Sequence, residues 1–338
     1  MTSSRAPFWL LAGLAAVAAL YLGVAREGPG FVVLGQWIAG WFGGPAPSLT
    51  DAFIVADIRA PRLLVALFGG AALALAGTVM QATFRNPLAS PDLVGTTAGA
   101  ALGGALMIVL DLSRVGVVAT PLGSLLGAML VTSLVFVLAR SHGRFAVSTL
   151  LLAGIALNTL VGALTSFVVT FTFDNYTASS RVLFWLMGGL EARTWEHALI
   201  TMLGCLGFAA LVAPRARDLD LLTLHDDTAH SRGVDAAAAR RYLVWCACGL
   251  TATTVSNTGG IAFVGLVVPH LARLLVGPSH RVLLPTSALL GALLLAASDF
   301  ACRLTPPDAN LRLGVVTAFL GAPYFLWLLA RHRRGEAL

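Results

Sequence analysis

Long apolar segments alternate with short polar segments along nearly the whole chain. A helix needs about 20 apolar residues to cross the hydrocarbon core of a bilayer. The pattern therefore predicts an all-α bundle of ten membrane-spanning helices that form one domain, 1–338. The predicted helices cover 8–25, 62–83, 93–110, 115–139, 146–173, 194–213, 241–258, 261–276, 282–303 and 313–331.

The composition supports a polytopic membrane protein. Of the 338 residues, 57% are hydrophobic and 11% are charged, whereas soluble domains average about 25% charged residues. So few polar side chains cannot cover a surface that faces water on all sides. This excludes a soluble enzyme, a disordered protein, a secreted disulfide scaffold and a nucleic-acid binder, and it makes membrane lipid a partner of the chain.

The arginines predict the orientation. All 22 basic residues are arginines, and with the N-terminus inside, 14 of them face the cytoplasm and 8 face outward. Because basic residues are enriched on the cytoplasmic side, both termini are predicted to be cytoplasmic. The first apolar run has 18 residues, longer than the signal-peptide core of about 7–15, so we expect an uncleaved helix.

Two longer polar segments interrupt the pattern. Residues 26–61 are rich in Gly, Pro and Trp, which indicates interfacial structure outside the membrane. Residues 214–240 form the longest polar segment on the predicted inner side, and their spaced leucines favour short amphipathic helices.

Glycines spaced four residues apart predict close helix packing. G-x-x-x-G occurs at Gly95–Gly99, Gly99–Gly103 and Gly123–Gly127. Since lipid provides no hydrophobic drive between helices, close backbone approach at such residues is expected to hold a tight bundle.

The predicted spans offer no internal energy source. The chain has no lysine for a nucleotide-binding phosphate loop, and the span interiors hold mainly neutral polar groups such as Asn158, Thr165 and Asn257. Ion-driven transporters place ionisable groups at mid-membrane. We therefore expect a pathway without ionisable groups and a separate ATPase docked on 214–240. A secondary transporter or channel, or a membrane-embedded enzyme, stays open as an alternative class.

No metal site is predicted. His225, Asp226 and His230 have suitable residue types, but no third ligand has matching spacing. The four cysteines fall within or at the ends of apolar segments, where small buried residues are expected.

Several long motifs carry a resemblance to a known family. The first half contains R-A-P-R-L-L (59–64), G-A-A-L-A-L-A-G-T-V-M-Q (70–81) and R-N-P-L-A-S-P-D-L-V-G (85–95). The second half contains G-G-I-A-F-V-G-L-V-V-P-H-L-A-R (259–273), H-R-V-L-L-P (280–285) and G-V-V-T-A-F-L-G-A-P-Y-F-L-W-L-L (314–329). Together they resemble the FecCD family, the permease subunits of ABC importers for cobalamin, ferric siderophores and haem.

The resemblance implies the type II ABC importer permease fold, with ten transmembrane helices per subunit. Helices two to five and seven to ten would be inverted repeats, and the fifth and tenth would line the pathway. It also implies a homodimer in a bacterial inner membrane, two cytoplasmic ATPase subunits that hold ATP and Mg, and a periplasmic substrate-binding protein. The chain itself would hold no cofactor and catalyse no bond chemistry. Its expected cargo is an iron complex, haem or a ferric siderophore, with cobalamin as the alternative.

The resemblance also implies roles for individual residues. Three arginines match positions that dock the binding protein, although interfacial anchoring is the simpler alternative for them. Four residues match cytoplasmic constrictions, and five match the segment that couples to the ATPase. Two residues depart from the family pattern: His225 stands where Gly is usual, and Arg312 stands where Pro is usual. The implied residues are Arg59, Arg62 and Arg303 for docking; Asn86, Leu88, Val147 and Ser148 for the gate; and Leu224, His225, Asp227, Ala229 and Gly233 for coupling.

Overall fold

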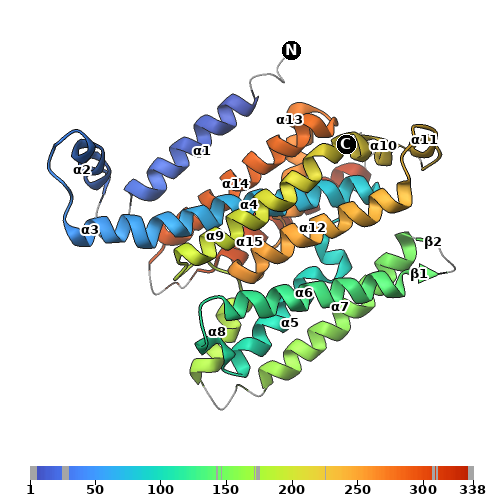
Figure 1. The fold of residues 1–338 in the computed structure, drawn as a ribbon, viewed down its shortest axis with the longest axis horizontal. Helices are drawn as coiled ribbons and strands as arrows, with labels where there is room; N and C mark the ends of the chain where they lie inside the picture. The colour runs from blue at the N-terminus through green and yellow to red at the C-terminus, as the bar shows by residue number, and fades with distance from the viewer. Residues whose placement is uncertain are drawn as a thin grey trace.

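The computed structural model is a bundle of helices, with one hairpin of two-residue strands (Figure 1). It describes residues 6–24, 30–141, 144–145, 147–170, 172, 176–224, 226–306, 309 and 311–333. In chain order, the elements are α1 (Ala6–Gly23), α2 (Phe31–Trp41), α3 (Leu49–Phe53), η1 (Ile54–Arg59), α4 (Ala60–Phe84), η2 (Pro91–Val94), α5 (Thr96–Val109), η3 (Leu112–Arg114), α6 (Ala119–Leu138), β1 (Arg140–Ser141), β2 (Arg144–Phe145), α7 (Val147–Thr170), α8 (Tyr176–Leu186), α9 (Trp195–Val212), η4 (Ala213–Arg215), α10 (Ala216–Thr223), α11 (Asp226–Ser231), α12 (Ala236–Thr258), α13 (Val264–Val276), α14 (His280–Leu304) and α15 (Leu313–Arg333).

All ten predicted spans coincide with helices, namely α1, α4, α5, α6, α7, α9 and α12 to α15. Within the described part of the chain, five helical segments are long and apolar enough to cross a membrane by themselves. Shorter apolar helices include α1, α5, α13 and α15. The all-helical membrane fold is therefore confirmed, whereas the sequence pattern did not predict the short helix α8.

The second predicted span begins earlier than expected. The helix starts at Leu49 instead of residue 62 and runs unbroken to Phe84. The side chain of Ser48 accepts a hydrogen bond from the backbone N–H of Asp51 and so caps its start. Pro61 would normally break such a helix because it lacks an N–H. Here the π-helical turn η1 immediately precedes it, and this looser turn lets the chain continue.

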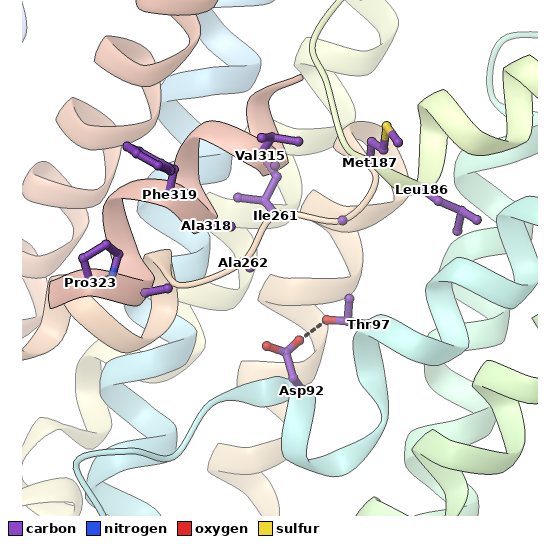
Figure 2. Close-up of a pocket in the computed structure, with 13 residues that line it drawn as sticks. Asp92, Thr97, Leu186, Met187, Ile261, Ala262, Val315, Ala318, Phe319 and Pro323 are labelled. Atoms are coloured by element: carbon purple, nitrogen blue, oxygen red, sulfur yellow. Dashed lines mark hydrogen bonds between the residues drawn. The ribbon is translucent and has the colours of Figure 1, made fainter. Parts of the chain in front are cut away.

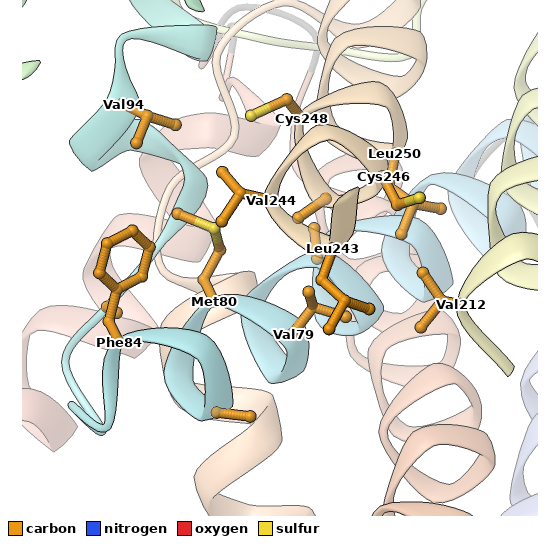
Figure 3. Close-up of a cluster of buried hydrophobic side chains, with 14 of the residues drawn as sticks. Val79, Met80, Phe84, Val94, Val212, Leu243, Val244, Cys246, Cys248 and Leu250 are labelled. Atoms are coloured by element: carbon orange, nitrogen blue, oxygen red, sulfur yellow. The ribbon is translucent and has the colours of Figure 1, made fainter. Parts of the chain in front are cut away.

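Helix α4 runs through the centre of the bundle (Figure 1). Its second half packs with α9, α10 and α12 in the largest buried apolar cluster, which includes Val79, Met80, Leu243 and Val244 (Figure 3). Helices α2 and α3 lie at one end of the bundle, and α10 and α11 lie at the other (Figure 1).

The glycine motifs do bring two helices into close contact. A Cβ atom at Gly99 would lie 2.4 Å from the carbonyl oxygen of Gly127, and one at Gly103 would lie 2.1 Å from that of Gly123. Since real Cβ atoms do not approach oxygen so closely, α5 and α6 touch backbone to backbone along these motifs.

The segment 214–240 folds into α10 and α11, as its apolar spacing predicted. Leu219, Leu221 and Leu222 are buried against the bundle. Asp235 caps the next helix, because its side chain accepts hydrogen bonds from the N–H groups of Ala237 and Ala238. These two bonds, together with the nearby charges of Arg241 and His230, outweigh a slight desolvation and hold the pKa of Asp235 below its usual value.

Candidate translocation pathway

A buried ion pair joins three helices at the end of the bundle where α1 ends. Arg62 on α4 donates hydrogen bonds from Nε and Nη2 to the two carboxylate oxygens of Asp299 on α14, at 2.8 and 2.7 Å. The hydroxyl of Tyr21 on α1 donates to the same carboxylate. Asp299 is completely buried, so this carboxylate is shielded from water and held by two helices besides its own.

The other two predicted docking arginines lie beside this ion pair. Arg59 donates from Nη1 to the carbonyl oxygen of Leu22 at 2.7 Å. Arg303 donates to the carbonyl of Tyr21 at 2.8 Å, and its guanidinium carbon lies 4.5 Å from the centre of the Tyr21 ring. The structure therefore brings all three arginines together, where they anchor the end of α1. Their docking role stays a prediction.

At the opposite end, Asp226 connects two helices to the coupling segment. Its carboxylate accepts hydrogen bonds from Arg85, just after α4, and from Nη2 of Arg240 on α12 at 3.1 Å. Arg85 also donates to the carbonyl of Leu222 at 2.7 Å, and Arg240 donates to that of Thr83 at 3.1 Å. Partial burial favours the protonated form of Asp226, but Arg240 and Arg85 outweigh it and hold its pKa below the usual value.

A second contact ties the coupling segment to α14. Oδ1 of Asp220 accepts a hydrogen bond from the backbone N–H of His280 at 2.9 Å and lies 2.7 Å from its Nδ1. The His280 side chain is 2% exposed, so this bond fixes the first turn of α14 to α10. Neither Asp220 nor Asp226 was predicted as a site residue, although the alternation of acids and arginines in 214–240 was a signal for such pairs.

The predicted coupling residues lie around α11. Leu224 is 52% exposed and Asp227 is also exposed, whereas Ala229 is buried. Gly233 follows the helix with φ of +80°, a left-handed conformation that suits a residue without Cβ. His225 lies outside the described residues.

The predicted gate residues occupy the loop after α4 and the start of α7. The side-chain oxygen of Asn86 accepts a hydrogen bond from the N–H of Leu88 at 2.9 Å, which stabilises a tight turn. Val147 and Ser148 form the first residues of α7, and their side chains lie outside the described part of the chain.

The turn η2, which follows this loop, packs closely against α7. Asn158 on α7 donates a hydrogen bond to the carbonyl of Asp92 at 2.7 Å. A Cβ at Gly154 would lie only 1.8 Å from the carbonyl oxygen of Leu93, so only glycine fits there. The loop that carries the predicted gate is thus held against the fifth predicted span.

A cavity of about 800 Å³ lies between these elements and α15 (Figure 2). Six of its lining residues come from α15, the tenth predicted span, and the others come from η2, α5, the end of α8 and the loop before α13. Its walls are mostly apolar. The lining residues are Asp92, Thr97, Leu186, Met187, Gly260, Ile261, Ala262, Gly314, Val315, Ala318, Phe319, Ala322 and Pro323.

The carboxylate of Asp92 lines this cavity, whereas the sequence predicted a pathway without ionisable groups. The hydroxyl of Thr97 donates a hydrogen bond to it (Figure 2). Asp92 belongs to the R-N-P-L-A-S-P-D motif, and the sequence placed it at a span boundary. The fold instead turns η2 inward, because the left-handed Gly95 that follows redirects the chain into α5.

A second cavity, of about 540 Å³, is rich in arginine and includes Arg181, Arg193 and Arg312 in its lining. Arg312, one of the two departures from the family pattern, forms an ion pair with Glu191 at 3.1 Å. Its guanidinium also lies 4.0 Å from the centre of the Phe184 ring. These contacts hold Arg312 against the end of α8.

The described residues contain no group of three or more His, Cys, Asp and Glu side chains arranged to hold a metal ion. All four cysteines are buried and free. The arrangement offers cavities and charged connections between helices.

Comparison with known proteins gives a consistent result. The model of the FecCD transport family matches residues 10–331. The Fe(3+) dicitrate transport system permease protein FecD of Escherichia coli is 39% identical over 96% of both chains. The hemin transport system permease protein HmuU of Yersinia pestis is 41% identical over 82% of this chain and 83% of that one. The cobalamin import system permease protein BtuC of Halobacterium salinarum is 38% identical over 88% and 82%, respectively.

The fold is also that of a solved transporter. An inward-facing metal-chelate type ABC transporter superimposes with a TM-score of 0.83 and 31% identity, over 97% of this chain and 99% of the other. The family match covers nearly all described helices. The chain therefore belongs to the FecCD transport family and is a permease of the metal-chelate type of ABC importer.

Proposed function

We propose that this chain imports an iron complex, haem or a ferric siderophore, by alternating access driven by a separate ATPase. The observation that carries the proposal is the Asp226 bridge, which connects the coupling segment with the last residues before the gate loop. Through it, a movement of α11 would pull on Arg85 and so on the turn formed by Asn86 and Leu88. The Asp220–His280 contact would pass the same movement to α14.

This arrangement of the helices supports the ATPase and the binding protein as partners. Two ATPase subunits would hold ATP and Mg and would seat α10 and α11, with exposed Leu224 and Asp227 as their contacts. The arginine cluster lies at the opposite end of α4 and α14 from these helices. There Arg303, which is half-buried, would meet acidic residues of a periplasmic binding protein, with Arg59 and Arg62 supporting it from within.

We further propose a homodimer in a bacterial inner membrane, with both termini in the cytoplasm. The arginine distribution supports that orientation. Helix α7 supports a lipid-facing or partner-facing surface, because its Leu152, Ile155 and Phe167 are all more than half exposed. The pathway would then be completed by the second copy.

Cobalamin is the second candidate cargo. The permease of a cobalamin import system covers 88% of this chain at 38% identity, close to the haem and ferric dicitrate permeases. A cavity of about 800 Å³ with apolar walls suits any of these bulky ligands.

The proposal is tested by uptake into proteoliposomes that contain the permease, the ATPase encoded beside it and the matching binding protein. Haem, a ferric siderophore and cobalamin are added to the proteoliposomes in parallel experiments. The lumen of the proteoliposomes contains the ATPase and either ATP or ADP. We expect uptake of one ligand with ATP only. Uptake that continues with ADP would support a secondary transporter and contradict the proposal.

A further inference from the structure

Among the described residues that line three neighbouring cavities, Asp92 is the single charged one. Besides the cavity of about 800 Å³, it borders one of about 150 Å³ and one of about 310 Å³. The other lining residues described for all three are apolar or neutral. The only formal charge that the described lining residues of one subunit offer to a ligand in this space is therefore negative.

This carboxylate is accessible and has no counter-ion among the described residues. The Asp92 residue is exposed because it borders the cavity, although the neighbouring residues Pro91 and Val94 of η2 are buried. Its side chain receives hydrogen bonds from the hydroxyls of Thr97 and Ser90, the latter at 3.4 Å. Both donors are neutral, so they orient the carboxylate without supplying a counter-charge.

The position of the carboxylate is fixed by its own backbone. The carbonyl of Asp92 accepts the hydrogen bond from Asn158, and the N–H of Gly95 bonds back to the same carbonyl at 3.1 Å. With η2 held between α7 and the start of α5, the side chain points toward Thr97 and the space below Ile261 and Ala262 (Figure 2). A fixed charge between apolar walls acts more strongly on a ligand than the same charge in water.

We propose that Asp92 selects the charge of the cargo: the pathway favours metal chelates that are neutral or carry a cationic group near the cavity wall, and it disfavours anionic chelates. This inference rests on the proposed import function and narrows its substrate class, because it favours neutral or cationic siderophore complexes over haem, whose two propionates are anionic. A cationic group within a few ångströms of Asp92 gains favourable Coulomb energy, whereas a carboxylate or catecholate there loses it. We expect each effect to change apparent affinity by a factor of about 10.

The arginine-rich cavity does not cancel this preference. Arg312 is paired with Glu191, and Arg193 donates to the carbonyl of Gly189 at 3.4 Å. Neither residue lines any of the three cavities that Asp92 borders.

The test uses three ferric trihydroxamates of similar size that differ in one pendant group: an amine, its acetylated form and its succinylated form. They are cationic, neutral and anionic, respectively. ATP-dependent uptake of each is measured for the native protein, for Asp92→Asn and for Asp92→Glu, always with the same binding protein, so that its own preference cancels in the ratios. Asp111→Asn is the matched control, since Asp111 is ion-paired with Arg114 on the surface and lines none of these cavities.

We expect Asp92→Asn to lower uptake of the cationic chelate about tenfold relative to the neutral one and to raise uptake of the anionic chelate. Asp92→Glu should retain the native order, and Asp111→Asn should change nothing. Equal effects of Asp92→Asn on all three chelates would overturn charge selection while leaving the import function standing. If the native protein moves none of the three with ATP, charge selection among such chelates is overturned, whereas the import function is decided separately by the parallel uptake of haem and cobalamin.

Discussion

The ion pair between Arg62 and Asp299 should be the most costly charged contact to break in this chain. Asp299 is 0% exposed and the Arg62 side chain is 15% exposed, and two short hydrogen bonds join them. Replacing Asp299 with Asn removes the negative charge and keeps the volume. The guanidinium of Arg62 then loses its counter-charge, and the Asn amide offers one acceptor oxygen where the carboxylate offered two to Arg62 and Tyr21.

The magnitude follows from this burial. Leaving one member of a buried pair without its partner costs about 3–5 kcal/mol. The double variant Arg62→Leu with Asp299→Leu leaves no uncompensated charge, and its main cost is the unsatisfied Tyr21 hydroxyl, about 1–3 kcal/mol. The double variant should therefore be less destabilised than Asp299→Asn alone, even though it alters more atoms.

The assay is reversible unfolding in mixed micelles, followed by tryptophan fluorescence, for Asp299→Asn and for the double variant. Arg114→Gln serves as the control, because the Arg114–Asp111 pair is exposed and should contribute less than about 1 kcal/mol. If Asp299→Asn cost no more than this control, the reasoning about the buried pair would be refuted. The same reasoning implies that loss of uptake in Arg62→Glu reports damage to the fold, so docking is better tested at Arg303.

Three further predictions concern other parts of the molecule. Asp226→Asn should lower ATP-dependent uptake several-fold while ATP hydrolysis by the bound ATPase continues, because Arg85 loses its ion pair with α11; unchanged uptake would contradict the proposed bridge. Folding lowers the pKa of Asp226, so its contribution is present above the ordinary value of about 4 and disappears as the pH falls through the lower folded value. The difference in unfolding free energy between native protein and Asp226→Asn should thus stay constant from about pH 5 to 8, and a slope in that range would argue against the assignment. Gly103→Ala should destabilise the α5–α6 contact by about 1–3 kcal/mol in the same unfolding assay, whereas Gly116→Ala, with no atom within 4 Å of the new Cβ, should not.

The spans were predictable because their signal is local. The thickness of the bilayer sets the length of a helix that spans it, and the ten apolar runs in the sequence come close to or exceed that length. Helix α8 was missed because its 11 residues are too few for that signal and include Arg181. The unbroken helix from Leu49 was missed because a proline normally predicts a boundary, and only the structure shows the π-helical turn that accommodates it.

The site was less predictable because its contacts join distant positions. Arg62 and Asp299 are 237 residues apart, so the sequence offered an outward-facing arginine and an acid near a span end without their pairing. Asp92 lay inside a recognised motif, but its place in the cavity depends on how η2 packs on α7. The coupling segment was found from its polarity and its family pattern, whereas the Asp226 bridge needed the positions of Arg85 and Arg240.

The cavity between η2 and α15 would serve as the translocation pathway in the proposed import, and cysteine accessibility reports on that role. The native cysteines are all buried, so Ala318→Cys, on the cavity wall, introduces one reactive site. Labelling by a membrane-impermeant thiol reagent is measured from each side of the membrane, in the complex with the ATPase, with and without a non-hydrolysable ATP analogue. If the cavity opens alternately to the two sides, the nucleotide should switch the side of the membrane from which Ala318→Cys reacts. Equal labelling from one side in both states, or none from either side, would contradict this role of the cavity.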